Sequence, residues 1–181
     1  MTGSREIFWL ACASAIVTAN AYYIHPIIAA VARDFGVSNA DIGIVPAVNQ
    51  IALALGVLLL LPLGDRVDNR KLVTLCLSVQ VLTLVAMAVT TSFVVFITAS
   101  TALGFFTITP YLLPAYASRR VTPQQLGYAT ALLTTGVIAG VQVSRLSAGV
   151  IGAYTDWRWV YWIAAALMAA AAIIVPRIMV P

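Results

Sequence analysis

Six apolar segments, joined by short connections, constrain the fold of this chain more than any other feature. A membrane-spanning helix needs about 20 apolar residues, and each of the six segments is long enough. Of the 181 residues, 62% are hydrophobic and only 9% are charged, whereas soluble domains carry about 25% charged residues. We therefore expect one all-α membrane domain over 1–181, with transmembrane helices at about 7–32, 42–63, 72–90, 94–116, 126–154 and 157–176.

The densest charge cluster, Asp65–Lys71, separates the second and third apolar segments. Charges are costly inside a bilayer, so this cluster is predicted to be a loop on one membrane face. Because Lys and Arg favour cytoplasmic loops, a cytoplasmic N-terminus suits the sequence. With this orientation, seven of the ten basic residues lie on the cytoplasmic side, only Arg33 and Arg158 lie on the outer side, and Arg145 lies within the membrane. We expect both termini in the cytoplasm. The net charge of +4 then reflects topology and does not indicate nucleic-acid binding.

The same loop carries a resemblance. Members of the major facilitator superfamily have Gly-x-x-x-Asp-Arg-x-Gly-Arg-Arg/Lys between helices 2 and 3, and Gly64–Lys71 resembles this pattern. Leu61 and Asp68 stand where the family has its two glycines. The resemblance implies a cytoplasmic gate, whereas the simpler alternative is a solvated basic loop. The predicted gating residues are Asp65, Arg66, Arg70 and Arg120.

Two more stretches resemble the superfamily. Residues 156–162 (Asp-Trp-Arg-Trp-Val-Tyr-Trp) are similar to the Gly-Trp-Arg-x-x-Phe opening of family helix 6. Residues 140–149 align with the helix 5 motif of its antiporters, but Ser144 and Arg145 replace the Gly-Pro pair. The resemblance covers the whole chain as the N-terminal six-helix half of a twelve-helix transporter with a 3+3 inverted repeat. It is nearest to bacterial sugar- or drug-efflux-like members, which implies the bacterial inner membrane.

Arg145 is the one charged residue near the middle of a predicted helix, and such residues often have functional roles. It could hold a polar or anionic substrate through forked hydrogen bonds, or it could have a structural role. In the family, helices 1 and 4 line the cavity. The aromatic rings and amides of these helices suit a mostly apolar or sugar-like ligand, so we expect a small sugar-like, anionic or amphipathic substrate. The predicted substrate-binding residues are Asn20, Tyr23, Asn49, Gln50, Phe105, Tyr111, Gln142 and Arg145; packing roles stay open for these aromatic rings and amides.

His25 is the single histidine, and imidazole can change its charge near neutral pH. It is the candidate for proton coupling, although a packing role is the alternative. The sequence offers no phosphate-binding glycine loop, no set of metal-spaced His and Cys, and no nucleophile–base pair. We therefore expect no cofactor, no metal and no enzymatic activity.

Three functions compete at this point. The first is a transporter half that works by alternating access, as a homodimer or with a second six-helix half. The second is a non-transporting membrane partner or scaffold; the chain could also be an isolated N-terminal fragment of a twelve-helix transporter. The third is an unrelated membrane enzyme, which would need a catalytic constellation that the sequence does not offer.

Overall fold

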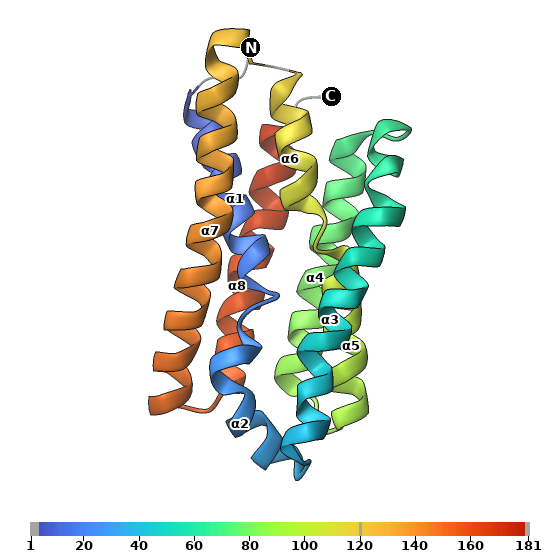
Figure 1. Cartoon of the computed structure of the whole chain (residues 1–181), viewed down its shortest axis with the longest axis vertical. Helices are drawn as coiled ribbons and strands as arrows, with labels where there is room; N and C mark the ends of the chain where they lie inside the picture. Colours follow the sequence, from blue (N-terminus) through green and yellow to red (C-terminus); the bar gives the residue numbers. More distant parts are fainter. Residues whose placement is uncertain (1–3, 120, 180–181) are drawn as a thin grey trace.

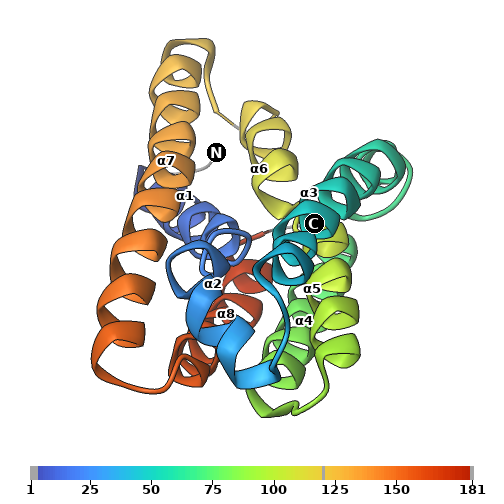
Figure 2. The same ribbon diagram turned by 60° about the horizontal axis from the view of Figure 1, so that its bottom comes forward.

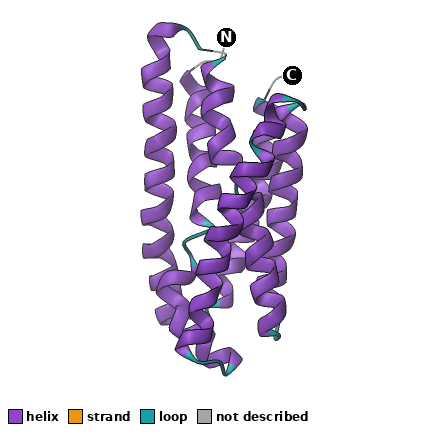
Figure 3. Ribbon diagram, turned by 45° about the vertical axis from the view of Figure 1, so that its right-hand side comes forward, coloured by secondary structure: helices purple, strands orange, loops and turns teal. Residues whose placement is uncertain are grey.

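A computed structural model of the chain describes residues 4–119 and 121–179, except the side chains of residues 4, 5 and 65. This part of the chain is helical, with turns and short connections and no strand (Figure 3). Its helices are α1 Ser4–Ala19, α2 Ile24–Phe35, α3 Asn39–Leu60, the 3₁₀ helix η1 Pro62–Asp65, α4 Asn69–Val89, α5 Phe93–Phe106, α6 Thr109–Ser118, α7 Pro123–Tyr154 and α8 Arg158–Ile178.

These helices form six spans that are long and apolar enough to cross a membrane, which confirms the all-α class and the count of six. The first and fourth spans differ from expectation, because each consists of two helices. The first is interrupted between Ala19 and Ile24, and the fourth between Phe106 and Thr109. We refer to these two interruptions as the first and second helix breaks.

A proline explains each break. Proline has no N–H to bond the carbonyl four residues earlier, and its ring clashes with that carbonyl. Pro26 follows Tyr22 by four residues, and Pro110 follows Phe106 by four. The two carbonyls find other partners. The carbonyl of Tyr22 lies 3.2 Å from Nδ1 of His25, and that of Phe106 accepts a hydrogen bond from the side chain of Gln80 at 2.9 Å.

The helix contacts follow the expected 3+3 repeat. Helix α1 packs against α7 as α5 packs against α3, while α2 reaches α3 and α6 reaches α7. Helix α4 packs against α8 across the centre. Figure 1 shows both termini at one end of the bundle, which we call the terminal end; the opposite end is the distal end. Figure 2, with the distal end turned forward, shows α2 between α7 and α3.

Glycines allow the closest of these approaches. A Cβ atom on Gly104 of α5 would clash with the carbonyl oxygen of Asn49 on α3. A Cβ atom on Gly140 of α7 would likewise clash with the carbonyl oxygen of Ala15 on α1. Small residues at membrane helix interfaces let two backbones approach closely. The two helix pairs that the repeat relates therefore use the same packing device.

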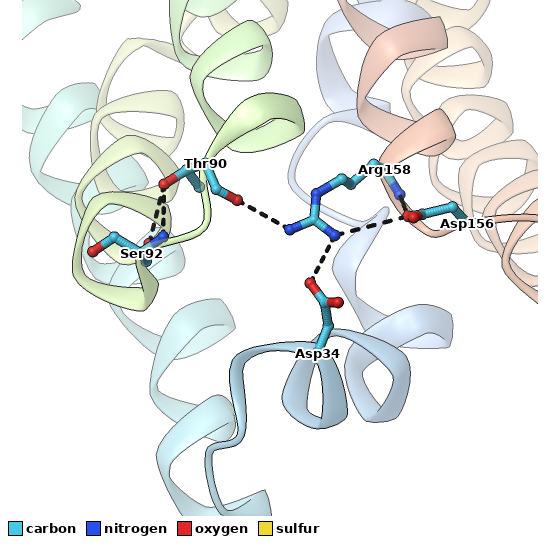
Figure 4. Close-up of polar contacts among 5 residues, drawn as sticks. All are labelled: Asp34, Thr90, Ser92, Asp156 and Arg158. Atoms are coloured by element: carbon cyan, nitrogen blue, oxygen red, sulfur yellow. Dashed lines mark hydrogen bonds and ion pairs between the residues drawn. The ribbon is translucent and has the colours of Figure 1, made fainter.

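Arg158 connects three chain segments at the distal end (Figure 4). Its guanidinium is 2.7 Å from the carboxylate of Asp34 at the end of α2, and it donates a 3.1 Å hydrogen bond to the carbonyl of Thr90. Its own backbone N–H donates to Asp156 at 2.8 Å. The neighbouring Trp157 is buried against Phe96. The Trp-Arg pair that resembles the family motif thus fixes the start of α8.

Candidate functional site

A cavity of about 240 Å³ lies beside the helix breaks. It is bounded by α1, α3, α6, α7 and the two breaks, and most of its wall is apolar. Small-molecule sites typically combine apolar walls with a few placed polar groups. The hydroxyl groups among the lining residues belong to Thr18, Tyr22, Thr107, Tyr111 and Thr134.

Gln80 of α4 joins the two breaks. Its side-chain NH₂ donates to the carbonyl of Phe106, and its carbonyl oxygen accepts a 3.4 Å hydrogen bond from Asn20. The Thr107 hydroxyl also lies 3.4 Å from that oxygen. Gln80 is fully buried, so these are hydrogen bonds inside an apolar bundle. Asn20, a predicted substrate contact, thus holds the first break to α4 in this structure.

Asn49 and Phe105 lie between α3 and α5. The Asn49 side chain is buried and donates a 2.7 Å hydrogen bond to the carbonyl of Ser100. Phe105 lines a shallow groove along α3 and α5 that is separate from the cavity. Gln50 is half-buried on α3. Tyr23 is buried in a smaller space between α1 and α7. The structure therefore does not bring these four predicted site residues into the lining of the 240 Å³ cavity.

Three of the predicted residues lie at or near the cavity. Tyr111 lines it and is 49% exposed. Arg145 extends from α7 over the ring of Tyr22, with Cζ 5.4 Å from the ring centroid. Gln142 is exposed one turn before Arg145. Arg145 therefore lies next to a cavity wall, because Tyr22 and Val141 both line the cavity.

His25 belongs to the same group of side chains. Its ring stacks on that of Tyr22, with centroids 5.7 Å apart and an angle of 24° between the planes. If Nδ1 carries the proton and donates to the carbonyl of Tyr22, Nε2 is left for another partner. His25 itself is exposed. The histidine and the arginine of α7 thus each contact the ring of Tyr22 at the first break.

The predicted gate loop lies at the terminal end, between α3 and α4 (Figure 1). Arg66 and Arg70 are both exposed there. Asp68, at a position where the family has glycine, caps α4 by accepting a 2.9 Å hydrogen bond from the N–H of Arg70. Asp65 ends η1, but its side chain lies outside the described part, as does the whole of Arg120.

Sequence reasoning missed Gln80 entirely. The sequence did contain an indication of this role, because Gln80 is an amide in the middle of an apolar segment. Polar groups inside a membrane must find hydrogen-bond partners. Tyr22 and Thr107 were visible as members of helices 1 and 4, yet nothing in the sequence singled them out as neighbours of Arg145 and Gln80. Tyr22 and Thr107 lie in the helix breaks, so their contacts with other helices depend on where the helices are interrupted.

Comparison with known proteins agrees with the fold. The sequence profile of the Major Facilitator Superfamily matches residues 10–181. The "Uncharacterized transporter YgaY" of Escherichia coli O157:H7 is 28% identical over 166 residues, which are 90% of this chain and 41% of that protein. The "Probable transporter SCO4007" of Streptomyces coelicolor is 30% identical over 160 residues, 88% of this chain and 37% of that protein. The chain thus spans about two-fifths of the length of these relatives. With six membrane-spanning-type helices and this family match, it is a multi-pass membrane protein that belongs to the Major Facilitator Superfamily.

Proposed function

We propose that the chain is one half of a transporter that moves a small organic solute by alternating access. The observation that carries the proposal is the cavity of about 240 Å³ beside the two helix breaks. In many transporters, substrates bind near the bilayer midplane where membrane helices are discontinuous. The superfamily and the transporter names of the two relatives support the same function.

The second half is another copy of the chain or a further six-helix unit. Superfamily halves are related by an axis along the membrane normal, so two copies with one orientation can pair. Helices α3 and α7, which the repeat relates, provide the surface for this contact. Their large exposed apolar side chains include Ile51, Leu55, Leu58, Ile138, Val143, Leu146 and Val150. The orientation follows from the basic residues, with both termini in the cytoplasm of a bacterial cell.

We assign a role to each predicted site residue from its place relative to the cavity and the helix breaks. Tyr111, Gln142 and Arg145 contact the substrate, whereas Asn20 and Asn49 hold the broken and closely packed helices in place. At the terminal end, Asp65, Arg66 and Arg70 form the moving gate contact with the second half. His25, exposed beside Tyr22, is the group that couples proton movement to transport.

Transport by reconstituted protein tests this proposal. We expect liposomes that contain the chain to accumulate at least one member of a labelled panel of sugars, organic anions and amphipathic cations. The assay is run with and without a pH gradient. Tyr111→Ala should lower that flux about tenfold, which corresponds to about 1.4 kcal/mol. Leu82→Ala, at an exposed apolar position of α4, is the matched control.

Two results would contradict parts of the proposal. If the chain forms stable monomers and moves no panel member, the homodimer form is wrong and a separate second half is required. If flux occurs and Tyr111→Ala leaves it unchanged, the cavity beside the helix breaks is not the transport site.

A further inference from the structure

We propose that Tyr22, His25 and Arg145 form a binding site for the carboxylate of a small organic anion. This inference rests on the proposed transport function and narrows its substrate class. The three side chains come from different parts of the fold: Tyr22 from the first break, His25 from α2 and Arg145 from α7. Both Arg145 and His25 contact the ring of Tyr22, at 5.4 Å and 5.7 Å from its centroid.

The first reason is the charge balance inside the membrane. The chain has six acidic residues, and each belongs to a helix end or a connection: Glu6, Asp34, Asp41, Asp65, Asp68 and Asp156. Asp34 is paired with Arg158, and Asp41 is bonded to Ser38. Among the described residues, no carboxylate forms an ion pair with Arg145. Arg145 is exposed on α7, and a cation that faces the bilayer is costly without an anionic partner, so a bound anion would stabilise this region.

The second reason is the chemistry of the donors. Arginine stays charged and presents a planar fork of N–H groups that matches the two oxygens of a carboxylate. The aromatic ring of Tyr22 limits where the guanidinium can lie, because a cation over an aromatic face is attracted to it. The imidazole of His25 contacts the same ring and contributes a further polar group to the site. Tyr22 and Tyr111 are the other titratable side chains at this site.

The third reason is the adjoining space. Tyr22 contributes to the wall of the 240 Å³ cavity, together with Val141 one turn before Arg145. Arg145 lies next to this wall, and Leu53, Leu133 and Val137 within it are apolar surfaces for the body of a bound ligand. The hydroxyl groups of Thr18 and Thr134 could bond a polar substituent on that body. The site therefore fits a compact monocarboxylate better than a large neutral sugar or a cation.

Binding measurements on the purified full chain in nanodiscs test the inference, with benzoate as the probe. Benzyl alcohol and benzylamine are the neutral and cationic comparison probes of similar shape. By calorimetry, we expect benzoate to bind at least tenfold more tightly than either comparison probe. Arg145→Gln should weaken benzoate binding at least tenfold, and Arg145→Lys should weaken it less, because Lys keeps the charge but lacks the fork.

Arg33→Gln is the matched control, since it removes one positive charge at an exposed position near the end of α2. It should bind benzoate as the unchanged protein does. Tyr22→Leu keeps Arg145 and His25 but removes the ring that both contact, and it should also weaken binding. This second variant keeps the inference testable if Arg145→Gln is poorly folded, as judged by size-exclusion chromatography.

Three outcomes would overturn the carboxylate site: no benzoate binding, equal binding of benzyl alcohol, or benzoate binding unchanged in both Arg145→Gln and Tyr22→Leu. Each leaves the transport proposal standing if the liposomes still move another solute. Conversely, specific benzoate binding without flux of any panel member would support the site and contradict transport by this chain without a separate second half. The binding and transport measurements can therefore contradict the carboxylate site and the transport proposal independently of each other.

Discussion

At the scale of the residue, Gln80 supplies what two broken helices lack. A helix break inside a membrane leaves backbone groups that water cannot reach, so side chains must satisfy them. Gln80 donates to the carbonyl that Pro110 cannot bond and accepts from Asn20 at the other break. One buried amide thus connects the first and fourth spans through the third.

We expect Gln80→Leu to lower the free energy of unfolding by about 1–3 kcal/mol, the usual cost of leaving buried polar groups without partners. The carbonyl of Phe106 and the side chain of Asn20 would both lose a hydrogen bond. Equilibrium unfolding in mixed micelles measures the change. Thr98→Val is the control, because the exposed Thr98 hydroxyl bonds only its own helix, at the carbonyl of Val94. Equal stability of Gln80→Leu and the unchanged protein would show that the bridge contributes nothing.

Arg158 gives a second prediction at this scale. Its ion pair with Asp34 is partly exposed, with side-chain exposures of 22% and 41%, and exposed pairs contribute only about 0.2–1 kcal/mol. Arg158 also donates a hydrogen bond to the carbonyl of Thr90. Arg158→Gln removes this bond as well as the ion pair, whereas Asp34→Asn removes the ion pair alone. We therefore expect Arg158→Gln to destabilise the protein more than Asp34→Asn does, by about 1 kcal/mol. Thermal unfolding of both variants measures the difference. A larger loss in Asp34→Asn would contradict this assignment.

The helix breaks show what the sequence could and could not predict. Pro26 and Pro110 were visible inside apolar segments, and proline is a known helix breaker. Yet Pro46 lies inside the continuous helix α3, so proline alone does not locate a break. The outcome also depends on whether a neighbour can bond the freed carbonyl, as Gln80 and His25 do here. That neighbour is known only once the helices are assembled, which is also why Tyr22 could not be placed beside Arg145.

At the scale of the element, the closest helix contacts depend on a few glycines. Gly140 of α7 faces the carbonyl of Ala15 on α1, whereas a Cβ atom on Gly127 of the same helix would meet no atom of another helix within 4 Å. Apolarity alone does not tell which of the two glycines faces another helix, although Gly140 belongs to the stretch that resembles the helix 5 motif. Segment length and apolarity were enough to predict the six spans, because those follow from the bilayer itself.

Gly140→Ala and Gly127→Ala form a matched pair within α7. We expect Gly140→Ala to lower stability by about 1–3 kcal/mol, because the added methyl group would push α7 away from α1. Gly127→Ala should be neutral or raise stability by up to about 1 kcal/mol, since alanine favours a helix over glycine. Resistance to unfolding by a denaturing detergent compares the two. Similar behaviour of the two variants would mean that the α1–α7 contact adjusts freely.

At the scale of the whole molecule, the six spans place both termini and the Asp65–Lys71 cluster at one end. The distal end carries the ion pair of Arg158 and Asp34 and the aromatic cluster around Phe96 and Trp157. Contacts at the distal end join helices within this chain. The basic loop at the terminal end instead presents the exposed side chains of Arg66 and Arg70. The exposed basic side chains at the terminal end are available to contact a second half, as the proposed gate requires.

The distribution of basic residues predicts which end faces the cytoplasm. Lys and Arg in short loops set orientation, and seven of the ten belong to the terminal end by sequence position. We expect a cysteine at Val67 to react with an impermeant maleimide only in inside-out vesicles, and one at Thr155 only in right-side-out vesicles. Cys12 and Cys76 are first replaced by alanine, which removes background labelling. Labelling of Val67→Cys from the outside would reverse the orientation and move the proposed gate to the opposite membrane face. Labelling of each site from both sides would indicate dual topology, which the seven-to-two bias makes unfavourable.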